Sequence, residues 1–241
     1  MYQLVHRKMP ASQPAPGDDA QAPPRKSAAR VVNPEANRQN IIEVATAEFS
    51  QHGLAGARVD EIASKTDCSK RLIYYYFGDK EGLYLAVLEN VYRRVRSVES
   101  ELDFDHVDPA EAMRRMVGFR FDHHFQNRDF VRLVTIENIH EARFLRQSDV
   151  IRELSAAAVE RVARIYRRGV EAGVFRDGIE PVDIHWQISA MSFYNVSNRD
   201  TFSALFGIQL DAPGNVARLR ANVIESVLRF VTKNTPANPE T

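Results

Sequence analysis

Apolar residues recur every three or four positions along most of the chain, which is the spacing of one face of an α-helix. The clearest stripe begins after Gly82 and predicts one helix at 82–102, about 30 Å long. The opposite face of this helix is rich in arginine, so we expect it to connect two parts of the protein rather than to be fully buried. Its apolar positions are Leu83, Val87, Val91, Val95, Val98 and Leu102.

The remaining segments also follow helical spacing. Asn33, Pro34 and Glu35 form a typical helix start, and the helix that follows is expected to stop at Gly53. No segment shows the alternation with a period of two that is typical of a strand, so the sequence predicts an all-α fold. Further helices are expected at 109–126, 129–146, 148–173, 181–198 and 213–233, with a short one at 200–206.

Residues 59–81 are expected to form a helix-turn-helix, made of a short helix, a tight turn and a second short helix. The turn is the tripeptide 66–68 (Thr-Asp-Cys), and Ser69 after it is a good capping residue for the second helix. Ile73 and Phe77 lie four positions apart and are expected to face inward. The residues left on the outside are Lys70, Arg71, Tyr74 and Tyr75.

Composition changes this picture only locally. Lys and Arg together number 32, as do Asp and Glu, so a surface that binds nucleic acid must be a local patch. Between Ser69 and Lys80 there are three bases and one acid, which supplies such a patch. The single cysteine, Cys68, excludes an intramolecular disulfide and fits a reducing compartment. With neither a membrane-spanning apolar run nor a signal peptide in the sequence, we expect a cytoplasmic protein.

The run from Ser69 to Leu83 (Ser-Lys-Arg-Leu-Ile-Tyr-Tyr-Tyr-Phe-Gly-Asp-Lys-Glu-Gly-Leu) resembles the tetracycline-repressor (TetR) family of transcriptional regulators. Ala45, Phe49, Gly53 and the segment 59–63 follow the same family pattern. The resemblance implies an all-helical homodimer that holds two heads on one palindromic operator in double-stranded DNA. It also implies release of the operator when a small-molecule effector fills the C-terminal domain, and no other cofactor.

On this reading, a three-helix helix-turn-helix domain for DNA binding occupies 33–80 and a helical ligand-binding and dimerisation domain occupies 81–235. Residues 1–32 and 236–241 are expected to be disordered tails. The basic segment 25–30 is either solvated or an arm along DNA. In the C-terminal half, the segment 186–207 is similar to the group that includes the pyrimidine-utilisation regulator, which senses nucleobases.

The DNA-binding head, residues 33–80, departs from the family pattern at two positions. The turn commonly reads Ala-Gly-Val in this family, and the position after Lys70 is often glycine, where this chain has Arg71. Arg71 is therefore a reader of guanine, worth about 1–3 kcal/mol of discrimination, a phosphate contact, or simply an exposed arginine. The residues expected at the DNA are Val59, Ser69, Lys70, Arg71, Leu72, Tyr74, Tyr75, Tyr76 and Lys80, with the lysines on phosphates and Tyr76 partly packed.

The C-terminal half offers fewer clear signals. Trp186 and Tyr194 lie eight positions apart on one helix face and can stack on a planar ligand, although packing alone explains each residue as well. The residues expected at the effector are Phe119, His123, Trp186, Tyr194 and Asn198.

The last two long helices are the expected dimerisation elements, in an intersubunit four-helix bundle. Some of their apolar positions must instead belong to the core of one chain. The candidate positions are Val182, Ile184, Ile188, Met191 and Phe193 on one helix, and Val216, Leu219, Val223, Val227, Leu228 and Val231 on the other.

Catalytic and metal-binding patterns are not found. His140 and Glu141 begin like a metalloprotease helix, but Phe144 stands where the second histidine is needed. His123 and His124 are adjacent and point in different directions on a helix. We therefore expect no enzyme and no metal site. The alternative to a DNA-binding repressor is an activator, or a helical protein that binds a ligand or partner and whose head does not read DNA.

Overall fold

The computed structural model describes residues 33–66 and 68–233. The predicted tails at 1–32 and 236–241, the basic segment 25–30 and Asp67 of the turn lie outside the described residues.

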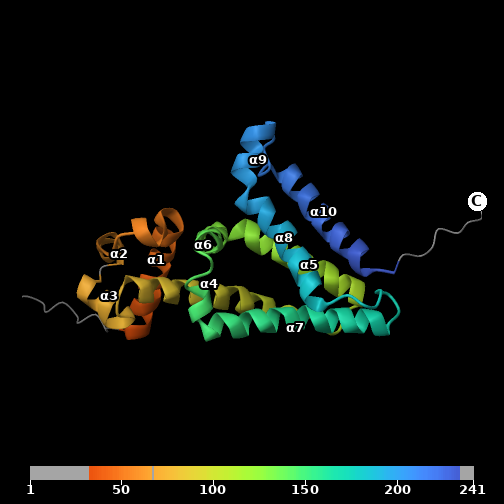
Figure 1. Ribbon diagram of the computed structural model, residues 1–241, viewed down its shortest axis with the longest axis horizontal. Coiled ribbons are helices and arrows are strands. Elements are labelled where there is room, and N and C mark those ends of the chain that lie inside the picture. The colour runs from red at the N-terminus through yellow and green to blue at the C-terminus, as the bar shows by residue number, and fades with distance from the viewer. Residues whose placement is uncertain (1–32, 67, 234–241) are drawn as a thin grey trace, which may run out of the picture. The chain divides into compact units, whose positions relative to one another are not determined.

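Within that part of the chain the fold is all-α, as predicted (Figure 1). The β-structure found there is one isolated bridge between Phe175 and Thr232. The first α-helix is bent at Gly53, whose φ of 64° and ψ of 177° are not helical. The helices are α1 (Pro34–Gly56), α2 (Val59–Thr66), α3 (Lys70–Phe77), α4 (Lys80–Ser100), α5 (Pro109–Gln126), α6 (Arg128–Ile139), the 3-10 helix η1 (Leu145–Gln147), α7 (Asp149–Glu171), α8 (Pro181–Ser197), α9 (Arg199–Phe206) and α10 (Pro213–Val231).

The prediction of one helix over 129–146 is wrong, because α6 ends at Ile139. The buried carboxylate of Glu137 accepts the backbone N–H groups of Phe144 and Leu145 at 3.0 and 3.1 Å, which folds the chain back after the helix. Glu141 and Ala142 follow with positive φ, a backbone conformation that helical periodicity does not anticipate.

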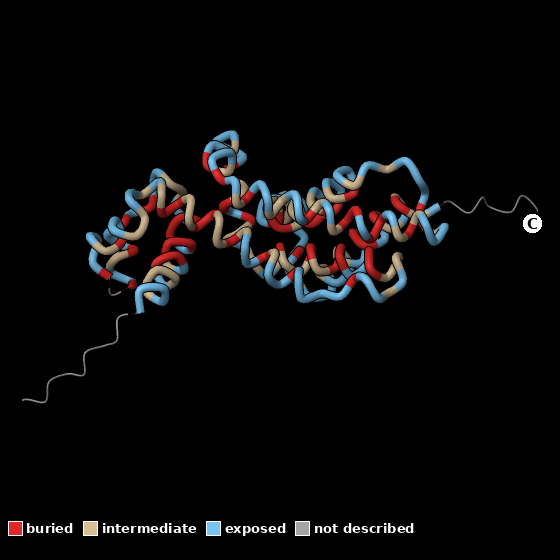
Figure 2. The backbone as a smooth tube through the Cα atoms, turned by 90° about the horizontal axis from the view of Figure 1, so that it is seen from below, coloured by how far each residue is buried: buried red, intermediate tan, exposed pale blue. Residues whose placement is uncertain are grey.

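A first hydrophobic core lies among α1, α2, α3 and the first half of α4. Leu133 of α6, Phe144 and Ile151 of α7 belong to the same core, so it extends well past the helix-turn-helix. Figure 2 shows buried positions, in red, along the whole helical part of the chain. Its fully buried members include Ile41, Phe49, Ile62, Ile73, Leu83, Tyr84 and Leu88.

A second core is formed by α5, α7, α8 and α10, which pack on one another. It includes five of the apolar positions offered as dimer contacts on the last two long helices, in line with the expectation that some of them belong to the core of one chain. Helix α8 has two apolar faces, and the sequence pattern alone did not distinguish the inner one. The positions are Ile184 and Ile188 of α8 and Val223, Val227 and Val231 of α10.

Only Gly78 and Asp79 connect α3 to α4. Gly78 has a φ of 78°, and Asp79 caps α4 by accepting the N–H of Gly82 at 2.7 Å. A Cβ atom at Gly82 would lie 2.1 Å from the backbone oxygen of Phe77, so no larger residue fits there. The direction of α3 is therefore set by α4.

Side chains also hold α4 against the turn that follows α6. Ser148 donates to Glu89 at 2.7 Å, and Arg143 forms an ion pair with Glu81 at 3.2 Å. Helix α1 is held to α6 by the hydroxyl of Ser50, which donates to Asp129 at 2.8 Å. These contacts tie the helix-turn-helix to α4, α6 and α7.

Glu137→Ala is expected to lower the free energy of unfolding by about 2–4 kcal/mol, because it leaves two buried N–H groups without their acceptor. Urea unfolding measures this loss, and hydrogen exchange of the Phe144 and Leu145 amides should accelerate. Glu137→Gln keeps one acceptor oxygen and should lose less. Equal stability of the alanine variant and the unsubstituted protein would show that Glu137 does not hold this turn.

Candidate functional site

Helix α3 has a buried face and an exposed face. The hydroxyl of Ser69 caps it by accepting the N–H of Leu72 at 3.2 Å, as the sequence predicts. Ile73 is buried in the first core, with Leu72 and Phe77 partly buried against it. Asn40 of α1 donates to the carbonyl of Thr66 at 3.3 Å and holds the end of α2 in place.

The outer face of α3 displays one guanidinium group and two phenols. Arg71 is exposed and has no ion-pair or hydrogen-bond partner among the residues that the structure describes. The side chain of Tyr75 is 80% exposed, and Tyr74 is also exposed. A free guanidinium group is a suitable bidentate donor to guanine, and phenolic hydroxyls can donate to phosphate oxygens.

The two lysines predicted for phosphate contacts already have partners. Lys70 forms an exposed ion pair with Asp60 of α2 at 3.0 Å, and this hydrogen bond raises the pKa of Lys70. Lys80 donates to the carbonyl of Ala55 at 3.3 Å. On binding DNA, each amino group would exchange its present partner for a phosphate.

Two predicted contact residues point inward. Val59 is 6% exposed and lies in the first core, so any contact it makes with DNA must come from its backbone. Leu72 is half-buried against the same core. Tyr76 is half-buried too, with its ring centroid 5.6 Å from that of Tyr75, which agrees with the expected partial packing.

Arg58 is a cation that the sequence reasoning missed. It lies directly before α2, is exposed, and is close enough to Lys70 to act on its pKa. The N–H of Arg58 donates to the buried carboxylate of Glu48 at 3.2 Å, and Lys65 contacts the same carboxylate at 3.4 Å. Its position in the sequence could have indicated this role, because the N-terminus of a helix is a common anion-binding site and Arg58 directly precedes α2.

The residues predicted for the effector lie on α5 and on α8 or directly after it. Phe119 and His123 lie on α5 with ring centroids 6.0 Å apart, and His123 lines a hollow of about 320 Å³ with Arg94 and Phe130. Trp186 lies on the outer face of α8 and is 71% exposed.

The other two predicted effector residues lie toward the C-terminal end of α8. Tyr194 is 56% exposed, and with Asn198 it lines a small hollow of about 70 Å³. Trp186 and Tyr194, the pair expected to stack on a planar ligand, both point away from the second core, and their place at an effector stays a prediction.

His124 is buried and His185 is half-buried. Nδ1 of His124 donates to the carbonyl of Arg120 at 2.7 Å, since a carbonyl only accepts. Burial is the largest cause that lowers the pKa of His123, His124 and His185 to about 4, and the positive charge of Arg120 contributes for each. All three rings are therefore neutral at pH 7.

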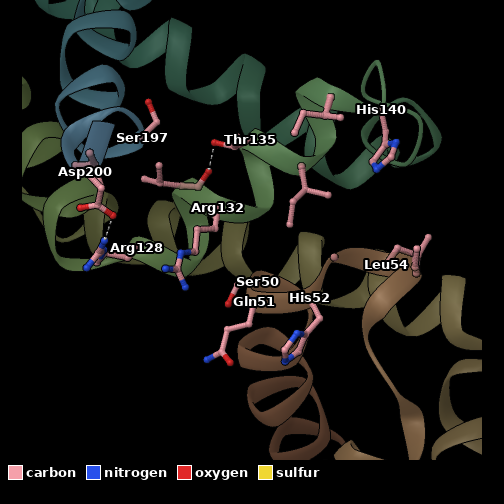
Figure 3. Close-up of a pocket in the computed structure, with 16 residues that line it drawn as sticks. Ser50, Gln51, His52, Leu54, Arg128, Arg132, Thr135, His140, Ser197 and Asp200 are labelled. Atoms are coloured by element: carbon pink, nitrogen blue, oxygen red, sulfur yellow. Dashed lines mark hydrogen bonds and ion pairs between the residues drawn. The ribbon is translucent and has the colours of Figure 1, made fainter. Parts of the chain in front are cut away.

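A larger hollow of about 580 Å³ lies where the end of α1 meets α6. Figure 3 shows Arg132 of α6 on one side of it and Gln51 and His52 of α1 on the other. Arg128 closes one edge through its ion pair with Asp200 of α9 at 3.1 Å. This hollow is open to solvent and lies beside the Ser50–Asp129 hydrogen bond that joins α1 to α6.

In the part of the chain that the structure describes, no group of three or more His, Cys, Asp or Glu side chains could hold a metal ion. None of the helices in that part of the chain is long and apolar enough to cross a membrane.

Two family models match this chain. The model described as "Bacterial regulatory proteins, tetR family" matches residues 41–87, which include all of α2 and α3. The model described as "Tetracyclin repressor-like, C-terminal domain" matches residues 109–227, from the start of α5 into α10.

Individual proteins match over most of the chain. The HTH-type transcriptional repressor NicS of Pseudomonas putida is 34% identical over 186 residues, which cover 77% of this chain and 88% of NicS. The HTH-type transcriptional repressor SCO4008 of Streptomyces coelicolor is 33% identical over 172 residues, 68% of this chain and 80% of that repressor. The crystal structure of SCO4942 from Streptomyces coelicolor superposes with a TM-score of 0.60 at 28% identity, covering 81% of this chain and 98% of SCO4942.

The buried histidines predict that the protein loses stability on mild acidification. A histidine with a pKa of about 4 in the folded chain and 6.5 in the unfolded chain takes up its proton first in the unfolded state. Its contribution is complete above pH 6.5 and is lost as the pH falls toward 4. For His124 the loss at pH 5 is about 1–2 kcal/mol.

Urea unfolding between pH 7 and 5 tests this, with His124→Asn as the variant, since its amide keeps the donor and does not titrate. Its stability should fall less steeply with pH than that of the unsubstituted protein. His52→Gln removes an exposed histidine and serves as the control. Identical pH dependence of the His124 variant and the unsubstituted protein would contradict the assignment.

Proposed function

This chain belongs to the TetR family of bacterial transcriptional regulators, and we propose that it is a homodimeric repressor released from its operator by a small-molecule effector. The DNA-binding unit in this proposal is 33–80, and 81–235 binds the effector and forms the dimer. The observation that carries the proposal is the exposed face of α3, where Arg71, Tyr74 and Tyr75 stand outward on a capped helix over a buried core.

Each exposed group has a distinct task at the DNA. Arg71, which has no partner among the described residues, reads a base edge in the major groove. Tyr74 and Tyr75 contact phosphates or thymine methyl groups, while Lys70 and Lys80 position the head on the backbone. So small a contact set gives little specificity alone, and two heads on half-sites about 34–36 Å apart along a palindrome supply the rest.

A stripe of exposed side chains on α8 supports dimerisation through this helix and α10. Val182, Trp186, Ala190 and Tyr194 are four positions apart and all exposed. Beside the stripe, an apolar hollow of about 400 Å³ lies between α8 and α10. Exposed apolar area of this kind is costly in water and is covered when a second copy brings the same face against it.

Helix α4 is the proposed route from effector to DNA. Its first half packs in the core that supports α3. The two-residue connection of Gly78 and Asp79, which caps α4, makes α3 move together with α4. An effector that prefers one position of α4 therefore changes the separation of the two heads. The size of the response equals the difference between its affinities for the two states.

Operator binding is tested by gel shift with DNA from upstream of the gene itself. We expect a shift at submicromolar dimer that weakens steeply with salt, because phosphate contacts release counterions. Arg71→Ala should reduce discrimination at one or two base positions by about 1–3 kcal/mol. Lys80→Ala should weaken binding to every sequence and reduce the magnitude of the salt slope by about 1.

The two variants control for each other, since both remove one positive charge from the head. If they changed affinity and base preference alike, the division between a reading and a positioning residue would be wrong. If micromolar dimer gave no salt-sensitive shift, the repressor proposal would fail. A helical protein that binds a ligand or partner without reading DNA would then remain.

Trp186→Glu is expected to convert the dimer to a monomer, because it places a charge in the middle of the proposed contact face. Sedimentation velocity at micromolar concentration measures the change. Ile139→Glu is the matched control, because Ile139 is also 71% exposed but belongs to α6 and lies outside the exposed stripe of α8. A Trp186 variant that sediments as a dimer would place the interface elsewhere.

A further inference from the structure

The end of α4 and the middle of α5 form a buried ionic cluster with more positive than negative charge. Glu99 at the end of α4 is fully buried and accepts Nη2 of Arg120 at 2.9 and 3.1 Å. Nη1 of Arg96 donates to the same carboxylate. Two guanidinium groups thus share one carboxylate, which leaves one positive charge uncompensated. Arg161 of α7 is also near enough to act on Arg120.

An uncompensated charge at this depth needs a partner. The side chain of Arg120 is only 5% exposed. Burial is the main cause that lowers its pKa, to about 10, so the guanidinium group keeps its proton at neutral pH. Removing an ion from water costs several kcal/mol, and an anion or a set of hydrogen bonds is needed to recover it.

Several polar atoms around the cluster have no hydrogen-bond partner in the described part of the chain. They are Nε of Arg96, Nε of Arg120, Nδ1 of His185 and the hydroxyl of Ser192. Ser192 is fully buried and lies two helical turns after His185, on the same face of α8. Buried donors are nearly always satisfied in native proteins, so unsatisfied donors from α4, α5 and α8 together indicate a ligand.

Aromatic rings line the same region. The ring centroid of His124 lies 5.7 Å from that of Phe130 and 6.0 Å from that of Phe193. Next to it, His123 lies 5.5 Å from Phe130 and 6.0 Å from Phe119. Because His124 donates through Nδ1, its Nε2 is an acceptor. The surroundings suit a planar ring that carries an acidic group.

We propose that Arg96 and Arg120, with His185 beside them and Ser192 two turns further along α8, recognise the carboxylate of a small aromatic monocarboxylic acid, which is the effector. The proposal rests on the proposed function and specifies the chemistry of its effector. A single negative charge balances the excess charge of the two arginines with Glu99. Hydrogen bonds between charged groups are about twice as strong as those between neutral groups, so an uncharged analogue should bind far less well.

The position of the cluster also accounts for the response. Arg96 and Glu99 lie in the last turns of α4, whose first turn follows the DNA-reading helix directly. A bound carboxylate competes with Glu99 for the guanidinium groups and so changes how the end of α4 is held against α5.

The test compares acids with uncharged partners of the same shape on the full-length protein without DNA. Benzoate is paired with benzamide, 1-naphthoate with 1-naphthamide, and uracil-6-carboxylate with uracil, the last pair addressing a nucleobase effector. Thermal shift and calorimetry measure binding. We expect at least one acid to raise the melting temperature and to bind at least ten times more tightly than its partner. Equal or tighter binding by the uncharged partners, or no binding by any acid at millimolar concentration, would overturn the proposal.

A double substitution, Glu99→Gln with Arg120→Gln, removes one buried charge of each sign, so the net charge of the cluster is kept while one of the two guanidinium groups that recognise the carboxylate is lost. It should weaken binding of the best acid at least tenfold. The matched control is Asp122→Asn with Arg220→Gln, which removes a bidentate pair with bonds of 2.8 and 2.9 Å between α5 and α10. The control should bind within twofold of the unsubstituted protein.

Arg120→Lys keeps the charge and the partner of Glu99 but removes the free Nε donor, and it serves if the double variant does not fold. It should weaken binding about fivefold. Unchanged affinity in whichever of these variants folds would exclude the cluster as the carboxylate site.

Failure of this proposal and failure of the proposed function are distinguishable, because acid binding is measured without DNA. If an uncharged compound released operator DNA, repression would stand and the carboxylate would be wrong. If the protein bound the acids but not its upstream DNA, the carboxylate site would stand and repression would be wrong.

Discussion

The ring of Tyr84 lies edge-on between two rings from distant parts of the chain. Its centroid is 5.1 Å from that of Phe49 in α1 and 5.1 Å from that of Phe144 in the turn after α6. All three side chains are buried, and edge-to-face pairs of this kind add stability beyond the area they bury. Burial, with Glu137 nearby, raises the pKa of the Tyr84 hydroxyl, so it stays neutral. The head and the first half of α4 therefore share one core.

This shared core explains how a site in the body can act on DNA. Helix α4 packs with the head at its start and carries the buried Glu99 and Arg96 at its end. A close-packed core does not deform continuously, so a change at one end of a helix is passed on as a shift of the whole element. The short link at Gly78 and Asp79 leaves α3 no freedom to absorb that shift.

Local features were predictable because they depend on neighbours in sequence. The cap at Ser69, the inward Ile73 and the outward Arg71 and Tyr75 all follow from helical spacing, and the structure has them where expected. The end of α6 was not predictable, because it depends on the Glu137 carboxylate, which accepts the backbone N–H of Phe144 seven residues further on. The Asp60 partner of Lys70 was missed for a similar reason, since it comes from the preceding helix.

By itself, the sequence determined the fold class, the helix-turn-helix and the family, because periodicity, capping and a contiguous motif are written in neighbouring residues. Only the tertiary structure decided which of two apolar faces of α8 is buried, so that Ile184 and Ile188 lie in the core while Trp186 faces outward. It also brought Arg96, Arg120 and His185 together from three helices. Charge balance in a buried cluster depends on distance in space, and spacing along the chain does not encode that distance.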